Sequence, residues 1–188
     1  MKPMTDRSAL LSSLEARLAT RVRVVPPSGI RRFFEIAATM EDVISLGIGE
    51  PDFVSPPAAI EAAIASLRAG QTGYTANAGL MELREAIAEE LARRYDVHYD
   101  PAREILVTVG VAEGIQLAML ALVEPGDEVL IPEPCFVSYG PTAVFAGGRV
   151  VYVPTSVEND FQVTAADLEP YISPRTKVLM IGYPNNPT

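Results

Sequence analysis

Residues 104–132, EILVTVGVAEGIQLAMLALVEPGDEVLIP, contain two short apolar runs separated by a segment long enough for a helix. Similar apolar runs follow at RVVYVP (residues 149–154) and KVLMIGYP (residues 177–184), again separated by stretches that can hold a helix. The runs are apolar throughout rather than alternating, which is typical of strands covered on both faces. Repeated strand–helix–strand units predict an α/β fold with a mostly parallel sheet flanked by helices.

The first 50 residues differ from this regular part of the chain. Asp6 and the leucines that follow it at helical spacing predict a capped helix, which VPPSGI (residues 25–30) ends. VISLGIGEPDF (residues 43–53) predicts a strand that runs into a loop. Further helices are predicted over residues 30–40, 55–70, 79–96, 112–124, 136–148 and 164–172.

Composition narrows the class of protein. The 188 residues carry a formal net charge of −9, which argues against a nucleic-acid surface, because such a surface needs clustered Lys and Arg. The single cysteine, Cys135, cannot form an internal disulfide, and one cysteine with one histidine offers no metal-ligand spacing. We find neither an apolar run long enough to span a bilayer nor a secretory signal pattern, so we expect a cytoplasmic protein.

Candidate functional residues follow the predicted strands, because ligands of open α/β sheets bind at the carboxyl ends of the strands. Gly110 opens a helix whose first backbone amides could hold a phosphate, although a plain strand-to-helix turn has the same pattern. Phe136 follows the second run and could stack on a flat ligand ring, or could be an ordinary core residue. Asn185 and Asn186 follow the last run, where their amides could offer hydrogen-bond donors and acceptors to a ligand or simply form a turn.

Four segments taken together resemble the pyridoxal-phosphate-dependent aminotransferases of fold type I, class I and II, of the aspartate aminotransferase kind. The resemblance runs from about Ser28 to Thr188, in the order and spacing of the family. The segments are LGIGEPDF (46–53), GYTANAGLMELREAIA (73–88), VTVGVAEGIQLAMLALVEPGDEVLIPEPCFVSY (107–139) and YPNNPT (183–188).

This resemblance implies a fold, a cofactor and an activity. Residues 1–50 would form an N-terminal arm with part of the small domain, and residues 51–188 the first part of the large domain that binds the cofactor. The cofactor would be pyridoxal 5'-phosphate. The enzyme would transfer an amino group between an L-amino acid and a 2-oxo acid through a Schiff base, as a homodimer in amino acid metabolism and biosynthesis.

The resemblance also assigns residues to the phosphate group. Val111 and Ala112 match the pair whose backbone amides hold the phosphate, and Tyr74 matches the tyrosine that reaches the phosphate of the neighbouring subunit. Members of the family often have Ser or Thr where Ala112 stands, so binding here would depend more on the backbone. Glu113 is a carboxylate near that anion, and we expect it to turn away or to cap the helix.

Three further assignments concern the ring and the substrate. Phe136 matches the aromatic residue that stacks on the pyridine ring, a place usually taken by Trp or Tyr. Asn186 matches the asparagine that hydrogen-bonds the phenolic oxygen of the ring. Gly49 matches the glycine whose backbone lies beside the substrate carboxylate.

The residue that should form the Schiff base has no counterpart in this chain. In the family this lysine, the aspartate paired with the pyridine nitrogen and an arginine for the substrate carboxylate all follow the Asn-Pro-Thr motif. The two lysines present, Lys2 and Lys177, lie near the N-terminus and at the start of the last predicted strand. We therefore expect the N-terminal half of an aminotransferase that is inactive alone.

Two alternatives stay open at this point. A non-catalytic binding protein of the same fold would also lack the lysine. A dinucleotide-binding oxidoreductase would have a strand, a glycine turn and a helix like those around Gly110, with Glu133 at the distance of a ribose-binding acid. The spacing Gly-x-x-x-Gly at residues 110–114 departs from the dinucleotide fingerprint, however, and leaves Tyr74, Phe136 and Asn186 without a role.

Overall fold

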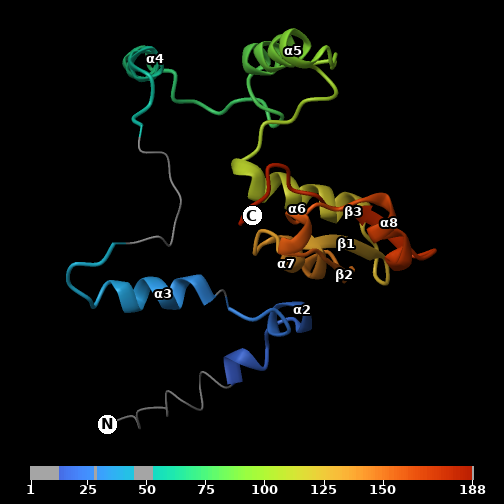
Figure 1. Cartoon of the computed structure of the whole chain (residues 1–188). Coiled ribbons are helices and arrows are strands. Elements are labelled where there is room, and N and C mark those ends of the chain that lie inside the picture. The colour runs from blue at the N-terminus through green and yellow to red at the C-terminus, as the bar shows by residue number, and fades with distance from the viewer. Residues whose placement is uncertain (1–12, 28, 45–52, 188) are drawn as a thin grey trace. The chain divides into compact units, whose positions relative to one another are not determined.

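The computed structural model describes residues 13–27, 29–44 and 53–187. The chain divides into two compact units, one formed by Met1–Ser28 with Val109–Thr188 and the other by Gly29–Thr108. The first unit contains a parallel sheet flanked by helices, which confirms the predicted α/β class (Figure 1). The predicted boundary between residues 50 and 51 falls among residues outside the described ranges and stays a prediction.

The sheet of the first unit has three parallel strands. β1 (Glu128–Glu133) lies between β2 (Arg149–Pro154) and β3 (Thr176–Leu179). The first four residues of β1 are buried, as expected for a strand covered on both faces. The three apolar runs that the sequence places here are therefore confirmed as strands, although β3 is shorter than its run.

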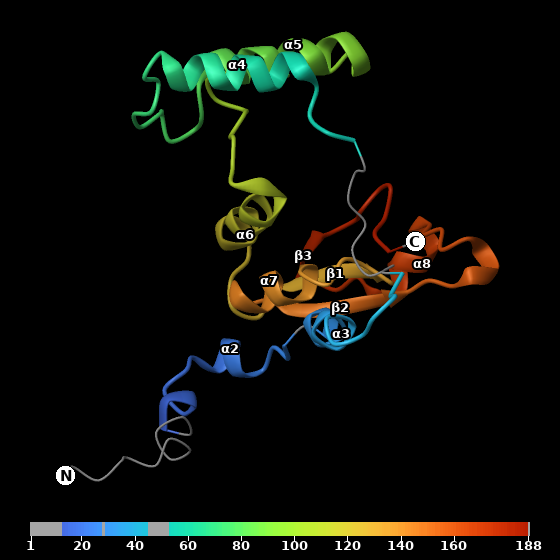
Figure 2. The same ribbon diagram turned by 90° about the vertical axis from the view of Figure 1, so that its left-hand side faces the viewer.

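Helix α6 (Gly110–Leu122) precedes β1, and helix α7 (Tyr139–Phe145) joins β1 to β2. Gly110 has φ +73°, a left-handed conformation that glycine adopts without strain, so the chain can turn sharply into α6. Both Figure 1 and Figure 2 show α7 lying along the sheet, which it contacts at β1 and β2. Side chains of α6, of the residue that follows it, of α7 and of β1 form the core: Met119, Val123, Val129, Ile131 and Ala143.

Short elements complete the first unit. Helix α2 (Thr20–Arg23) lies against α7. The chain between β2 and β3 forms a 3-10 turn, η1 (Val157–Asn159), then α8 (Ala165–Leu168) and η2 (Glu169–Tyr171). A capping box begins α8, because Thr164 and Asp167 satisfy each other's backbone N–H groups.

The second unit is helical, with α3 (Gly29–Ala37), α4 (Pro57–Arg68) and α5 (Met81–Tyr95) at the predicted positions. Arg84 on α5 is buried and donates hydrogen bonds to the carbonyls of Pro101 and Ala102, at 2.9 and 3.3 Å. These bonds hold the chain that follows α5 back against the helix.

One predicted strand is absent from the structure. Residues 104–109 are not a strand, and the backbone N–H of Val107 bonds to the carbonyl of Ala78, before α5, at 3.0 Å. Apolar composition alone does not make a strand, because a strand also needs a neighbouring chain to form a ladder. The strand predicted over residues 43–53 and the helix predicted behind Asp6 lie largely outside the described residues. Among the described helices, none combines the length and apolar character needed to cross a bilayer.

Candidate active site

The candidate site lies where the three strands end. Because the strands are parallel, the chain leaves β1, β2 and β3 at the same edge of the sheet. A cavity of about 330 Å³ opens there, a size typical of small-molecule sites. Residues that follow all three strands line this cavity, among them Pro134, Cys135, Thr155, Phe161, Tyr183 and Asn185.

A hydrogen bond joins the loop after β1 to the loop after β3. The amide Nδ2 of Asn185 donates to the carbonyl oxygen of Pro134 at 2.9 Å, in a partly buried position. The two residues are 51 positions apart in the chain. Phe136 lies two residues after Pro134 and Asn186 directly follows Asn185, so this bond brings together the segments that carry both predicted ring-binding residues.

The ring of Phe136 packs edge-on against Tyr139, with 5.8 Å between the ring centroids and 73° between the planes. Phe136 keeps 38% of its surface exposed. That exposure distinguishes it from an ordinary core phenylalanine, because part of the ring remains accessible to a flat ligand.

The first turn of α6 presents backbone amides and a carboxylate. Glu113 accepts a hydrogen bond from the backbone N–H of Val109, so it caps the helix, as one of our two expectations for it stated. Val111 and Ala112, in the same turn, are exposed. N–H groups in the first turn of a helix have no partner within the helix and suit an anion.

Cys135 contributes an uncharged group to the cavity. Burial, together with the carboxylate of Glu133, raises the pKa of the Cys135 thiol above its usual value. The thiol is therefore protonated at neutral pH and is a weak nucleophile. We assign it no chemical step.

The predicted site residues fall into three groups. Val111, Ala112, Phe136 and Asn186 all lie in the first unit, although none of them lines the cavity itself. Tyr74 lies in the second unit with a fully exposed side chain. Gly49 lies outside the described residues. The roles of all six stay predictions.

Sequence reasoning named Asn185 as a candidate but did not predict its contact with Pro134, and it gave Tyr139 no role. Asn185 was visible only as the first of a doubled asparagine, and Tyr139 only as part of a matching segment. Neither pattern predicts a contact, because each partner comes from a different part of the chain.

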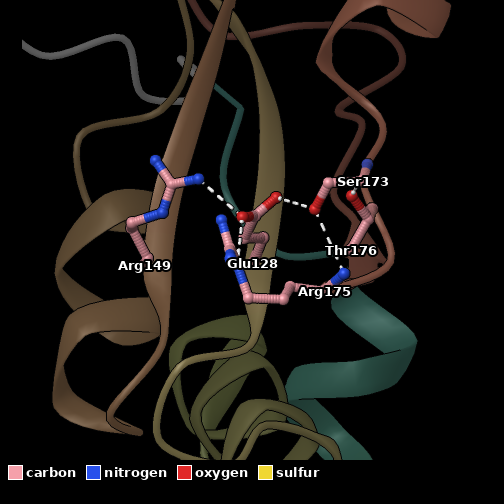
Figure 3. A network of polar contacts seen from close by, with 5 residues as sticks. All are labelled: Glu128, Arg149, Ser173, Arg175 and Thr176. Atoms are coloured by element: carbon pink, nitrogen blue, oxygen red, sulfur yellow. Dashed lines mark hydrogen bonds and ion pairs between the residues drawn. The ribbon is translucent and has the colours of Figure 1, made fainter.

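The amino ends of the strands carry a separate polar network (Figure 3). Glu128 at the start of β1 is buried and is bonded by Arg149, Ser173 and Arg175. Lys177, near the start of β3, is exposed at this end of the sheet, away from the candidate site.

The chain matches proteins of known class over most of its length. The family model described as aminotransferase class I and II matches residues 41–188. An aspartate aminotransferase of Pyrococcus abyssi is 48% identical over 171 residues, which are 91% of this chain and 44% of that protein. An aromatic-amino-acid aminotransferase of Thermococcus litoralis is 44% identical over the same shares.

Solved structures of aminotransferases also resemble this chain. The crystal structure of an aspartate aminotransferase from Thermotoga maritima matches with a TM-score of 0.86 and 36% identity, over 91% of this chain and 46% of that one. The chain thus spans less than half the length of the relatives it matches.

Proposed function

Because the chain belongs to the class I and II aminotransferase family, we propose that it forms part of the cofactor-binding domain of an aminotransferase. The reaction would move an amino group between an L-amino acid and a 2-oxo acid. The relatives named for aspartate and for aromatic amino acids indicate the donors to test first. Family membership also leaves the dinucleotide-binding alternative without support.

The observation that carries this proposal is the joined pair of loops at the carboxyl edge of the sheet. The Asn185–Pro134 bond holds the Asn186 segment against the Phe136 segment, beside a cavity of suitable size. A ring binder and a carboxamide delivered by separate strands to one edge suit a planar ligand with a polar substituent.

The residues present fit pyridoxal 5'-phosphate. The first turn of α6 offers backbone N–H groups at Val111 and Ala112 for the phosphate, and the partly exposed ring of Phe136 offers a face for the pyridine ring. Asn186, which is exposed, can donate or accept a hydrogen bond at a ring oxygen. When bound, the cofactor supplies the electron sink for amino transfer.

The residues of this chain would bind and orient the cofactor. They would not carry out the proton transfers of the reaction. Lys177 lies at the opposite end of the sheet and Lys2 outside the described residues, so we assign neither to the reaction. We propose that the covalent attachment, the substrate contacts beyond Gly49 and the homodimer contact through Tyr74 belong to the complete enzyme. A cytoplasmic location is part of the same proposal.

Cofactor binding by this chain can be measured by equilibrium dialysis. We expect retention of pyridoxal 5'-phosphate, and at least a fivefold weaker affinity in the variants Phe136→Ala and Asn186→Ala, which remove the stacking face and the carboxamide. Ser66→Ala is the control, because Ser66 on α4 also donates a side-chain hydrogen bond, to Oε1 of Gln71 at 2.8 Å, and neither residue lines the cavity. Equal affinity in all four proteins would contradict the proposed site.

The activity can be tested in a chimera. Joining this chain to the part of the Pyrococcus abyssi relative that lies beyond the matched region would supply the missing lysine. We expect a visible absorbance band with the cofactor and amino transfer from an L-amino acid to 2-oxoglutarate. A folded chimera that binds the cofactor but transfers no amino group would favour the non-catalytic alternative.

A further inference from the structure

Asn185 lines the cavity of the candidate site, and its side chain also joins two of the loops that form that cavity. We propose that Asn185 is a positioning residue. Its side-chain amide holds the loop after β3 against the loop after β1, and this contact places Asn186 and Phe136 where both can bind the same ligand. This inference rests on the proposed function, but its first test does not require any cofactor.

The position of this hydrogen bond allows it to hold the two loops together. Asn185 is half-buried, and its Nδ2 lies 2.9 Å from the carbonyl oxygen of Pro134. Both loops contain prolines, at 134, 184 and 187, whose rings restrict the backbone on either side of the contact. In loops with so few free torsions, fixing one donor and one acceptor constrains the neighbouring residues as well.

A second contact path links Asn185 to Phe136 through Gly182. A Cβ placed on Gly182 would lie 3.1 Å from the hydroxyl of Tyr139 and 3.2 Å from Oδ1 of Asn185. The amide and the phenol therefore both pack closely over this glycine. Tyr139 in turn supports the edge of the Phe136 ring, so packing and hydrogen bonding set the same geometry.

The chain carries its own reporter for this geometry. Cys135, the only cysteine, lies between Pro134 and Phe136 and lines the same cavity as Asn185. Cys135 is half-buried, so its alkylation rate by iodoacetamide reports how far the loop around it exposes the thiol.

We expect the variant Asn185→Ala to raise the Cys135 alkylation rate about fivefold, the opening that corresponds to the net loss of one hydrogen bond. Ser66→Ala should leave the rate unchanged, because its bond to Gln71 lies in the second unit and neither residue lines the cavity. Asn185→Asp, which keeps the shape but replaces the donor with an acceptor, should react at least as fast as the Ala variant. Asn185→Gln, which keeps the amide donor, should fall between Ala and the unaltered chain.

A thermal unfolding curve for each variant identifies any loss of the whole fold. Should Asn185→Ala fail to fold, Gly182→Ala supplies the test, because its methyl group presses on the amide and on Tyr139 without removing the donor. We expect this variant to raise the alkylation rate as well, by a smaller factor.

The second measurement is the affinity for pyridoxine 5'-phosphate, which has the ring and the phosphate but no aldehyde to react with amines. A positioning residue requires that Asn185→Ala weaken this affinity about fivefold or more and that Asn185→Gln restore part of it. An unchanged alkylation rate in both Asn185→Ala and Gly182→Ala overturns the inference. Faster alkylation with unchanged affinity also overturns it, because the bond would then be structural alone. Failure of the unaltered chain to bind either pyridoxine 5'-phosphate or pyridoxal 5'-phosphate would count against the proposed function, and overturn the positioning role with it, while leaving the measured loop contact intact.

Discussion

The carboxylate of Glu128 lies 2.5 Å from the guanidinium of Arg149, on the neighbouring parallel strand (Figure 3). Arg175 and Ser173, just before β3, bond to the same carboxylate at 2.9 and 2.7 Å. Only 1% of the Glu128 side chain is exposed, whereas both arginines are largely exposed. One buried acid therefore ties together the amino ends of all three strands, opposite the candidate site.

Replacing Glu128 with Gln should destabilise the first unit. Gln has the same size but no charge, so both arginines lose a charge-assisted hydrogen bond and a buried amide gains poorly matched partners. We expect a lower midpoint of urea unfolding, followed by circular dichroism.

Glu90→Gln is the matched control for this variant. Glu90 also bonds two arginines, Arg93 and Arg94, but its side chain is 45% exposed and its partners lie on the same helix. Exposed pairs of this kind contribute little to stability. A loss in Glu90→Gln equal to that in Glu128→Gln would contradict a special role for the buried network.

The contribution of Glu128 to the stability of the fold should depend on pH. The hydrogen bond from Arg149, followed by that from Ser173, lowers the pKa of Glu128 from 4.5 to about 2. A carboxyl whose pKa is lower in the folded state stabilises the fold above its unfolded value and loses that contribution as pH falls toward its folded value. The difference in unfolding midpoint between the unaltered chain and Glu128→Gln should therefore be constant above about pH 5 and shrink between pH 4.5 and 2. A difference that does not vary with pH in that window would show that the charge of Glu128 is not responsible.

The cost of adding a methyl group at Gly140 should depend on the hydroxyl group of Tyr152. Gly140 is buried at the start of α7, and a Cβ on it would overlap the hydroxyl of Tyr152 on β2, whereas the ring carbon beneath that hydroxyl would be 3.5 Å away. We expect Gly140→Ala to cost about 1 kcal/mol of unfolding free energy, the lower end for overpacking, because the exposed ring can shift. The double variant Gly140→Ala with Tyr152→Phe should recover most of that loss. Additive losses in the double-mutant cycle would contradict this contact.

The helices and strands that a local run of residues is enough to identify were predictable from the sequence. β1 and β2 follow from unbroken apolar runs, and α6 follows from Gly110 and the apolar segment behind it. Residues 104–109 have the same apolar character as β1 but form no strand, because pairing depends on a neighbour that composition does not specify.

The candidate site was predictable in part, for a related reason. The edge of the sheet that carries Phe136 and Asn186 follows from the parallel order of the strands. The contacts that organise that edge join residues far apart in the chain, as Asn185 and Pro134 do across 51 positions. The burial of Glu128 likewise depends on Arg149 and Arg175, which no local pattern around residue 128 reveals.

Glu113 should weaken phosphate binding at the first turn of α6 even though it caps the helix. Its carboxylate accepts a hydrogen bond from the N–H of Val109, two residues before Val111. Gln at position 113 can accept the same bond without the negative charge. One unit charge a few ångströms from an anion in a water-like environment changes the binding constant by about threefold to fivefold.

We therefore expect Glu113→Gln to bind pyridoxine 5'-phosphate about threefold to fivefold more tightly than the unaltered chain, in equilibrium dialysis at low salt. The gain should diminish as potassium chloride is added, because salt screens exposed charges. Glu124→Gln is the control, since Glu124 is exposed beyond the opposite end of the same helix. If Glu113→Gln and Glu124→Gln change the affinity equally, the effect comes from net charge rather than from the first turn of α6. That result would contradict the prediction that the backbone amides of Val111 and Ala112 bind the phosphate.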